Sequence, residues 1–129
     1  MATIEVTEQN FNDIADKGIV LLDFWATWCP PCRMFGPIFE KASEKHDDIT
    51  FGKIDTDAQQ NLAQGFEITS IPTLMAIRDG IVVFAQPGAI PEPTLEDLIS
   101  QVRALDMDAI RAELSEELKN AEMNSSEQQ

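Results

Sequence analysis

Hydrophobic residues are arranged along the chain in a way that predicts a buried sheet. Residues 19–25 are apolar at both odd and even positions, which is typical of a central strand covered on both faces. Residues 49–55 predict a second core strand. Residues 73–78 and 81–85 flank Asp79-Gly80, a dipeptide that favours a two-residue β-hairpin turn.

Helical spacing and helix-ending residues predict helices between and after these strands. In the segment that follows the cysteines, Met34, Ile38 and Ala42 share one face, and Pro37 predicts a kink. The expected helices are 8–15 with Thr7 as N-cap, 33–45, a helix opened by Asp57 through Ala63, and 95–105 opened by Thr94 with Asp97. The order of elements predicts an α/β fold with a central mixed five-stranded sheet (βαβαβαββα) and helices on both faces.

The composition changes after residue 105, so we expect a domain over residues 1–105 and an acidic helical tail over 106–129. The tail holds seven acidic and two basic residues, a net charge of −5. Apolar residues recur in it at helical spacing, namely Met107, Ile110, Leu114 and Leu118. Residues 124–129 predict a polar, frayed end.

Length, charge and hydropathy exclude several classes of protein. The chain has 129 residues, 43% of them hydrophobic, which is enough to bury one core. Its net charge of −14 argues against nucleic acid and anionic membranes as partners, because both are bound through clustered cations. The longest apolar run is too short to span a bilayer, and the first residues lack the pattern of a signal peptide. We therefore expect a cytoplasmic protein.

The candidate chemistry lies in two cysteines separated by two residues. If Cys29 stands at a helix N-cap, Pro30 occupies the first helical position, where a missing N–H costs nothing. The N–H groups of Cys32 and Arg33 are then expected to point at the Cys29 sulfur. Together with the helix dipole they would lower the pKa of Cys29. The pattern predicts Cys29 as the attacking nucleophile and Cys32 as a buried resolving thiol.

Two other interpretations of the cysteine pair are weaker. A tetrahedral zinc site needs four ligands, and His46 is the only other soft donor. His46 itself is expected to be a solvated residue at a helix end. A purely structural disulfide is uncommon in a cytosolic chain. A redox-active dithiol is therefore favoured, with no metal.

The residues around the cysteines resemble thioredoxin. The resemblance rests on Trp25-Ala26-Thr27-Trp28-Cys29-x-Pro31-Cys32-Arg33-Met34 followed by Pro37, and on Ile71-Pro72-Thr73. It extends from about residue 5 to about residue 105. It implies a protein-disulfide reductase that cycles a Cys29–Cys32 disulfide, binds no other cofactor and serves cell redox homeostasis. Disulfide-containing proteins would be its substrates, and an NADPH-dependent thioredoxin reductase would restore its dithiol.

The resemblance also gives two charged residues a role. Asp23 lies within an apolar run, where it is either a carboxylate at a frayed strand end or a buried acid with a raised pKa. The resemblance favours the second interpretation and implies that Asp23 takes the proton of Cys32. Without the resemblance, Lys53 would be interpreted as a solvated charged residue. The resemblance implies instead that Lys53 is the charged partner of Asp23.

A third set of residues would form the surface that docks substrates. The resemblance implies a cis Ile71–Pro72 bond that faces the disulfide and leaves the Ile71 backbone free to pair with an extended peptide. Pro30 departs from the family, which typically has Gly there; it removes one N–H and stiffens the turn, with opposing effects on the redox potential. The expected substrate-binding residues are Trp28, Pro30, Pro31, Ile71, Pro72 and Gly88.

Two further functions remain as alternatives at this point. The same cysteine pair can serve an oxidase or isomerase, depending on its redox potential. In a different class, the protein is a binding or holdase module whose tail recruits partners through its apolar positions.

Overall fold

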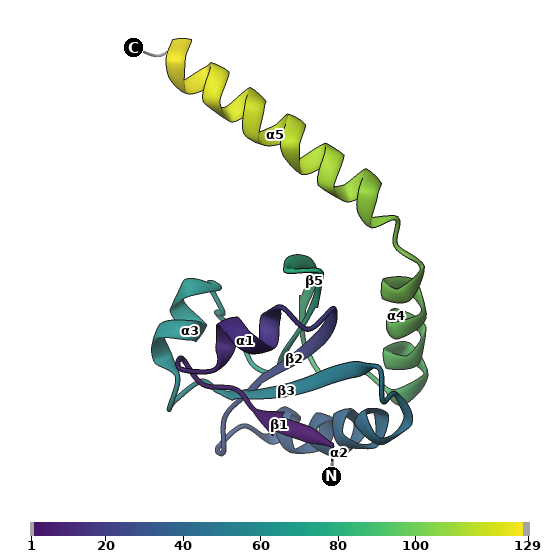
Figure 1. Cartoon of the computed structure of the whole chain (residues 1–129). Coiled ribbons are helices and arrows are strands. Elements are labelled where there is room, and N and C mark those ends of the chain that lie inside the picture. Colours follow the sequence, from purple (N-terminus) through teal and green to yellow (C-terminus); the bar gives the residue numbers. More distant parts are fainter. Residues whose placement is uncertain (1, 128–129) are drawn as a thin grey trace.

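A computed structural model describes the fold of residues 2–127, and it contains the predicted mixed five-stranded sheet (Figure 1). The strand order is β1-β3-β2-β4-β5, with β1, β3 and β2 parallel and β4 and β5 antiparallel to their neighbours. The strands are β1 (Thr3–Glu5), β2 (Ile19–Trp25), β3 (Ile49–Asp55), β4 (Thr73–Arg78) and β5 (Ile81–Pro87). The helices are α1 (Phe11–Ala15), α2 (Pro30–Lys45), α3 (Gln60–Gly65), α4 (Glu92–Ala104) and α5 (Met107–Glu127).

Strand β2 lies at the centre of the sheet and is covered on both faces, as its sequence predicts. Leu21 packs into the core beneath α2 and α4, whereas Val20 and Leu22 pack into the core beneath α1 and α3. The close approach of β1 and β2 to β3 requires glycine at position 52, because a Cβ there would lie 2.5 Å from a methyl group of Val6. The sheet thus holds the end of β2, where the cysteines follow, in a fixed place.

Helix α2 buries only part of the face that the sequence predicted. It begins at Pro30 and continues through Pro37, and its buried side chains include Phe35, Phe39 and Ala42. Ile38 also packs against this core, whereas Met34 is 71% exposed, so its place on the predicted face was wrong. The rings of Phe35 and Phe39 occupy the core positions because each buries more apolar surface than a methionine side chain. The kink at Pro37 stays a prediction.

Helix α1 begins at Phe11, and the predicted N-cap at Thr7 was wrong. The Thr7 N–H donates to Asn10 Oδ1 at 2.7 Å, and the Asn10 N–H donates to Thr7 Oγ1 at 3.3 Å. This reciprocal pair closes a turn before the helix, so the helix itself starts one turn later.

Helices α3 and α4 also begin at residues other than those predicted. Helix α3 starts at Gln60 instead of at Asp57, because Asp55 Oδ1 accepts the N–H of Asp57 and so forms a turn there. Helix α4 starts at Glu92 with Pro91 as N-cap, so the predicted cap at Thr94 was wrong. Prolines fit the first turn of a helix, whose N–H groups have no partner within the helix.

The β4–β5 hairpin turns at the predicted dipeptide. Asp79 and Gly80 have φ values of 54° and 79°, the left-handed conformations that a type I′ turn needs. Strand β5 continues to Pro87, two residues past the predicted end, and forms one edge of the sheet.

His46 joins α2 to α4 and is not the solvated residue expected from its charged neighbours. Its Nε2 lies 2.6 Å from Glu96 Oε2, and its Nδ1 lies 3.0 Å from Arg103 Nη2. Its ring stacks on Phe51. Because the partners lie 50 and more positions along the chain, the local sequence could not reveal them.

Helix α5 continues the chain away from the sheet (Figure 1). Met107 is buried at its start, whereas Leu118 is 65% exposed. The helix extends to Glu127, so the predicted frayed end is helical from residue 124 to 127, and residues 128–129 lie outside the described part. Within residues 2–127, no helix is long and apolar enough to cross a membrane.

Candidate functional site

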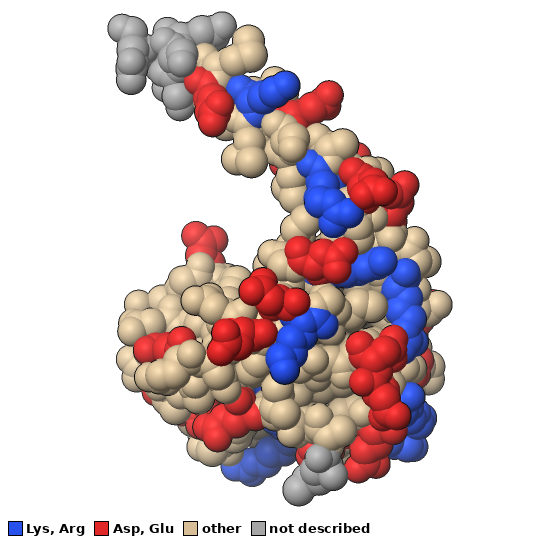
Figure 2. Space-filling view, in the orientation of Figure 1, with Lys and Arg blue, Asp and Glu red and all other residues tan. Residues whose placement is uncertain are grey.

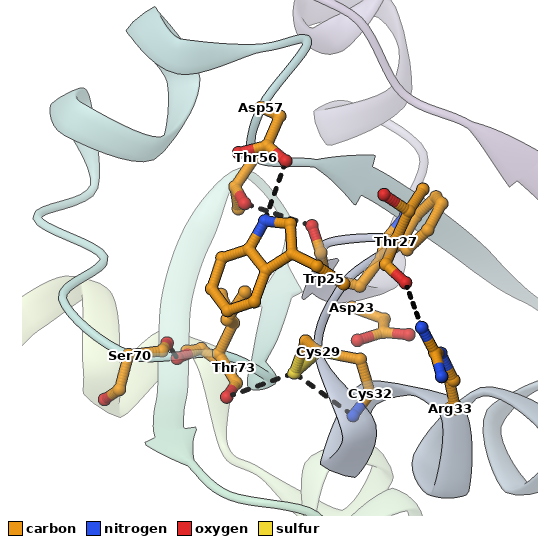
Figure 3. The surroundings of a disulfide bond; sticks show 12 residues. Asp23, Trp25, Thr27, Cys29, Cys32, Arg33, Thr56, Asp57, Ser70 and Thr73 are labelled. Carbon is orange, nitrogen blue, oxygen red and sulfur yellow. Dashed lines mark hydrogen bonds between the residues drawn. A yellow bond between two sulfur atoms is a disulfide. The ribbon is translucent and has the colours of Figure 1, made fainter.

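The two cysteines lie where β2 ends and α2 begins, and they form a disulfide (Figure 3). Cys29 is the N-cap of α2, with an extended backbone, and Pro30 follows at the start of the helix. Proline suits this position because the first helical N–H has no partner within the helix. The predicted placement of both residues is confirmed.

Backbone groups of the first turn surround the Cys29 sulfur. The Cys32 N–H donates to Cys29 Sγ at 3.3 Å, as predicted. The Arg33 N–H instead donates to the Cys29 carbonyl oxygen at 3.3 Å, so its predicted direction was wrong. That bond is the ordinary i to i−4 bond of the helix. One N–H and the helix dipole therefore favour negative charge on Cys29.

The burial of the two cysteines does not separate their roles. Cys29 is 2% exposed and Cys32 is 5% exposed in the disulfide form. Cys32 is therefore buried, as predicted, and Cys29 is buried as well in this form. The difference between them lies in their surroundings, since Cys29 caps the helix and Cys32 borders a cavity.

Asp23 and Lys53 lie side by side on neighbouring strands beneath the cysteines. They face each other in the β2–β3 register, and Lys53 Nζ is 3.7 Å from Asp23 Oδ2. Asp23 is fully buried, and neither of its carboxylate oxygens accepts a hydrogen bond from the described residues. Burial raises the pKa of Asp23 from 3.8 to about 6, and the positive charge of Lys53 partly opposes that rise.

Lys53 and Cys32 both border one cavity. The cavity has a volume of about 580 Å³, and its lining includes Trp25, Cys32, Gly36 and Lys53. Lys53 Nζ lies 5.2 Å from the centre of the Trp25 ring, within the range of a cation–π contact. Lys53 and Cys32 thus share one space beside the buried carboxyl group.

The loop before β4 lies against the disulfide, as the resemblance implies. The Ile71–Pro72 bond is cis, and the Ile71 carbonyl oxygen lies 3.7 Å from Cys29 Sγ. The Gly88 N–H donates to the Pro72 carbonyl oxygen at 2.8 Å, so Gly88 is part of the same corner. Pro72 itself is buried, whereas Gly88 is exposed.

An exposed apolar edge surrounds the disulfide on the α2 side. Trp28 is 62% exposed, and Pro30 and Pro31 are exposed beside it. The Trp28 indole N–H donates to Asp57 Oδ2 at 2.9 Å. The sequence did not indicate Asp57 as a site residue, because only the fold brings it next to a side chain 29 positions away.

The side chain of Arg33 makes a contact at the site that the sequence did not indicate. Its Nη2 donates to the Thr27 carbonyl oxygen at 3.0 Å, which ties α2 to the loop before it (Figure 3). Among the residues whose side chains are described, no three His, Cys, Asp or Glu side chains are grouped so that they could hold a metal ion.

A disulfide at a helix N-terminus, at the end of a central strand of this sheet, defines a thiol–disulfide oxidoreductase. The thioredoxin family model matches residues 2–101. Putative thioredoxin 2 of Streptomyces coelicolor is 53% identical over 121 residues, covering 93% of this chain and 90% of that protein. The thioredoxin of Bacillus subtilis is 39% identical over 102 residues, covering 78% of this chain and 98% of that protein. The chain belongs to the thioredoxin family.

Solved structures agree with this assignment. A mutant thioredoxin from Halobacterium salinarum has a TM-score of 0.75 and 34% identity, covering 81% of this chain and 93% of that one. The thioredoxin of Malassezia sympodialis has a TM-score of 0.71 and 34% identity, covering 81% and 94%. The expected fold, family membership and oxidoreductase activity are therefore confirmed. The substrates of this family are proteins that contain disulfides.

Proposed function

We propose that this protein reduces disulfides in other proteins, with Cys29 as the nucleophile. The Cys29 thiolate attacks one sulfur of the substrate disulfide, forms a mixed disulfide and releases the other substrate sulfur as a thiolate. The Cys32 thiolate then attacks Cys29 Sγ and releases the second substrate thiolate. Two electrons pass to the substrate, and the Cys29–Cys32 disulfide remains. The observation that carries this assignment is that Cys29 caps α2 and accepts the Cys32 N–H.

Asp23 is proposed to accept the proton of Cys32 before the second attack, and Lys53 to tune this proton transfer. A carboxyl group with a pKa of about 6 can exchange a proton near neutral pH. The cavity beside Cys32 and Lys53 has room for a water that would carry the proton. The ammonium group of Lys53 favours the ionised form of Asp23, which is the form that accepts a proton.

The substrate is proposed to dock on the apolar edge around the disulfide. Its backbone would pair with Ile71, whose carbonyl oxygen lies against Cys29 Sγ. This role is supported by the exposure of Trp28, Pro30 and Pro31 next to Cys29, and by the hydrogen bond of Gly88 to Pro72 beside Ile71. The proposed contact residues are Trp28, Pro30, Pro31, Ile71, Pro72 and Gly88.

The working cycle needs a source of electrons, which we propose is an NADPH-dependent thioredoxin reductase. The proposed compartment is the cytoplasm, because thiols there are kept reduced and a disulfide reductase is maintained in its active form. No cofactor beyond the Cys29–Cys32 disulfide is proposed. In this setting the protein would carry electrons for cell redox homeostasis.

We further propose that the chain divides into a thioredoxin domain over residues 1–105 and a helical tail over residues 106–129. This boundary is supported by the end of α4 at Ala104 and the start of α5 at Met107. The family model, which ends at residue 101, is in keeping with it.

A trapping experiment tests the assignment of the two cysteines. Cys32→Ser should accumulate mixed disulfides with client proteins, because the first attack proceeds and the second cannot. Cys29→Ser is the matched control and should trap few or none. The reduction potential of the Cys29–Cys32 pair, measured against glutathione, supplies the second readout. Equal trapping by both variants, or a strongly oxidising potential, would contradict the reductase assignment.

A further inference from the structure

Strand β5 and helix α5 enclose a groove at the end of the sheet away from the disulfide. The groove has a volume of about 230 Å³. Its apolar lining comes from both elements, with Val82 on β5 and Leu114 on α5 as partly exposed members. Neither the dithiol chemistry nor the expected substrate surface uses any of these residues.

The base of α5 is attached to the domain beside the groove. Met107 is buried, and Asp106 Oδ1 accepts the N–H of Ala109 as a helix cap. Arg111 lies 3.6 Å from Asp79 in the hairpin turn, and so ties the second turn of α5 to the sheet.

A second anchor acts on the chain just before α5. Arg78 Nη1 donates to the carbonyl oxygens of Val102, Arg103 and Leu105, at 2.8, 3.1 and 2.9 Å. These carbonyls lie at the end of α4, where C=O groups run out of partners within the helix, although the Val102 oxygen also accepts the N–H of Leu105. The connection between α4 and α5 is therefore fixed, and α5 projects from the domain at a set position.

Past this base, the apolar side of α5 has no cover within the described residues. Leu114 is 36% exposed and Leu118 is 65% exposed, and they follow Ile110 at intervals of four, which places them on one face of the helix. Val82 on the strand beside them is 46% exposed. A continuous apolar surface of this kind marks an interaction site.

The charges beside the groove indicate which kind of partner it can bind. Glu113 and Glu117 line the groove together with its apolar residues. The whole segment 106–129 carries a net charge of −5, and Figure 2 shows acidic side chains along α5. A second copy of this acidic helix, like nucleic acid or an anionic membrane, would be repelled. A partner segment with apolar residues between lysines or arginines would match both the apolar lining and the acidic side chains of the groove.

We infer that this groove binds a basic amphipathic helix of a partner protein, with the partner's apolar side chains against Val82 and Leu114 and its cations against Glu113 and Glu117. The groove begins where β4 ends, and the disulfide lies beyond the start of that six-residue strand. A strand of this length separates the groove from the disulfide by about 20 Å, at the rise per residue of an extended chain. The partner therefore leaves the dithiol free, and it binds the oxidised and reduced forms equally.

A peptide titration on the full chain tests this inference. The probe is a fluorescent synthetic helix with leucines along one face and lysines on both sides of them, and its affinity is measured by anisotropy. Glu117→Lys should weaken binding by about tenfold, because it replaces attraction by repulsion. Glu116→Lys is the matched control: it makes the same change of charge one residue away, outside the groove lining, and should leave the affinity within about twofold.

A second pair of variants tests the apolar contact. Leu114→Ser should weaken peptide binding, whereas Met123→Ser should not, because Met123 is also apolar, at 62% even more exposed than Leu114 at 36%, and lies on the opposite side of the helix. Circular dichroism confirms that the variants keep their helix content. A probe in which glutamates replace the lysines should not bind.

Three results would overturn the inference. The first is equal binding of the lysine and glutamate probes. The second is equal loss of affinity in Glu117→Lys and Glu116→Lys. The third is a dimer, seen by sedimentation, that Leu114→Ser dissociates, since the groove would then be covered by a second copy. The affinities do not depend on Cys29 or Cys32, so failure here is distinguishable from failure of the proposed reductase activity.

Discussion

The ammonium group of Lys53 lies 3.7 Å from a carboxylate oxygen of Asp23, a side chain with no exposed surface. The β2–β3 register places the two residues directly opposite each other. The carboxyl group keeps a pKa of about 6 because desolvation outweighs the favourable charge of Lys53. This balance makes the pair sensitive to pH close to neutrality.

Asp23→Asn should stabilise the protein at neutral pH and not at acidic pH. The pKa of Asp23 is higher in the folded protein than its usual 3.8, so ionisation costs the folded state free energy. The cost is absent below about pH 4, grows as the pH rises, and is complete above about pH 6, where it amounts to about 2–3 kcal/mol. Urea denaturation of both proteins at pH 4 and pH 7.5 measures the difference. A gain that is the same at both pH values would contradict the raised pKa.

Lys53→Gln should raise the pKa of Asp23 further. The variant removes the charge that lowers this pKa and leaves the burial that raises it. The carboxyl resonance of Asp23, followed by NMR as the pH is changed, reports the shift. Lys53→Arg keeps the positive charge and should leave the pKa closer to that of the unmodified protein. An unchanged pKa in Lys53→Gln would show that the 3.7 Å contact carries little energy.

Trp28→Phe should lower the rate of protein-disulfide reduction several-fold with little effect on stability. The exposed indole contributes apolar surface beside the disulfide, and Asp57 fixes its orientation through one hydrogen bond. Loss of that bond should change the free energy of unfolding by about 1 kcal/mol or less. The kcat/KM for a protein substrate measures the effect. Asp57→Asn keeps an acceptor oxygen and is the matched control; a comparable loss in it would argue for a role of the Asp57 charge.

Two variants of α2 should differ strongly in stability. Phe39→Ala removes a fully buried ring that packs on Phe35 and Phe51, at a cost of about 3–5 kcal/mol. Met34→Ala removes an exposed side chain and should change the free energy of unfolding by about 0.5 kcal/mol or less. Thermal and urea denaturation measure both. Similar losses would mean that Met34 belongs to the core after all.

The predictions from sequence were most accurate for the strands and for the cysteine motif. The bounds of β2 and β4 follow from runs of apolar residues, which a strand covered on both faces requires, and those of β3 from Ile49, Phe51 and Ile54 in a short segment. The hairpin follows from Asp79-Gly80, because few other dipeptides adopt left-handed backbone conformations at both positions. The N-cap position of Cys29 follows from the adjacent proline.

The beginnings of helices were predicted poorly. Thr7, Asp57 and Thr94 all have side chains that can cap a helix, yet none of them does so here. A short polar side chain forms turns as readily as caps, and which of the two occurs depends on residues that the fold brings near. The Asp57 side chain, for example, accepts the Trp28 indole.

The sequence by itself determined the strands β2, β3 and β4, the hairpin and the chemistry at the start of α2, because each depends on neighbours within a few positions. Only the tertiary structure decided which side chains meet across larger separations. The 3.7 Å approach of Lys53 to Asp23, the position of Ile71 against Cys29 and the groove between β5 and α5 depend on the register of strands and the packing of helices. These contacts join distant segments, so their geometry is fixed only when the whole core has packed.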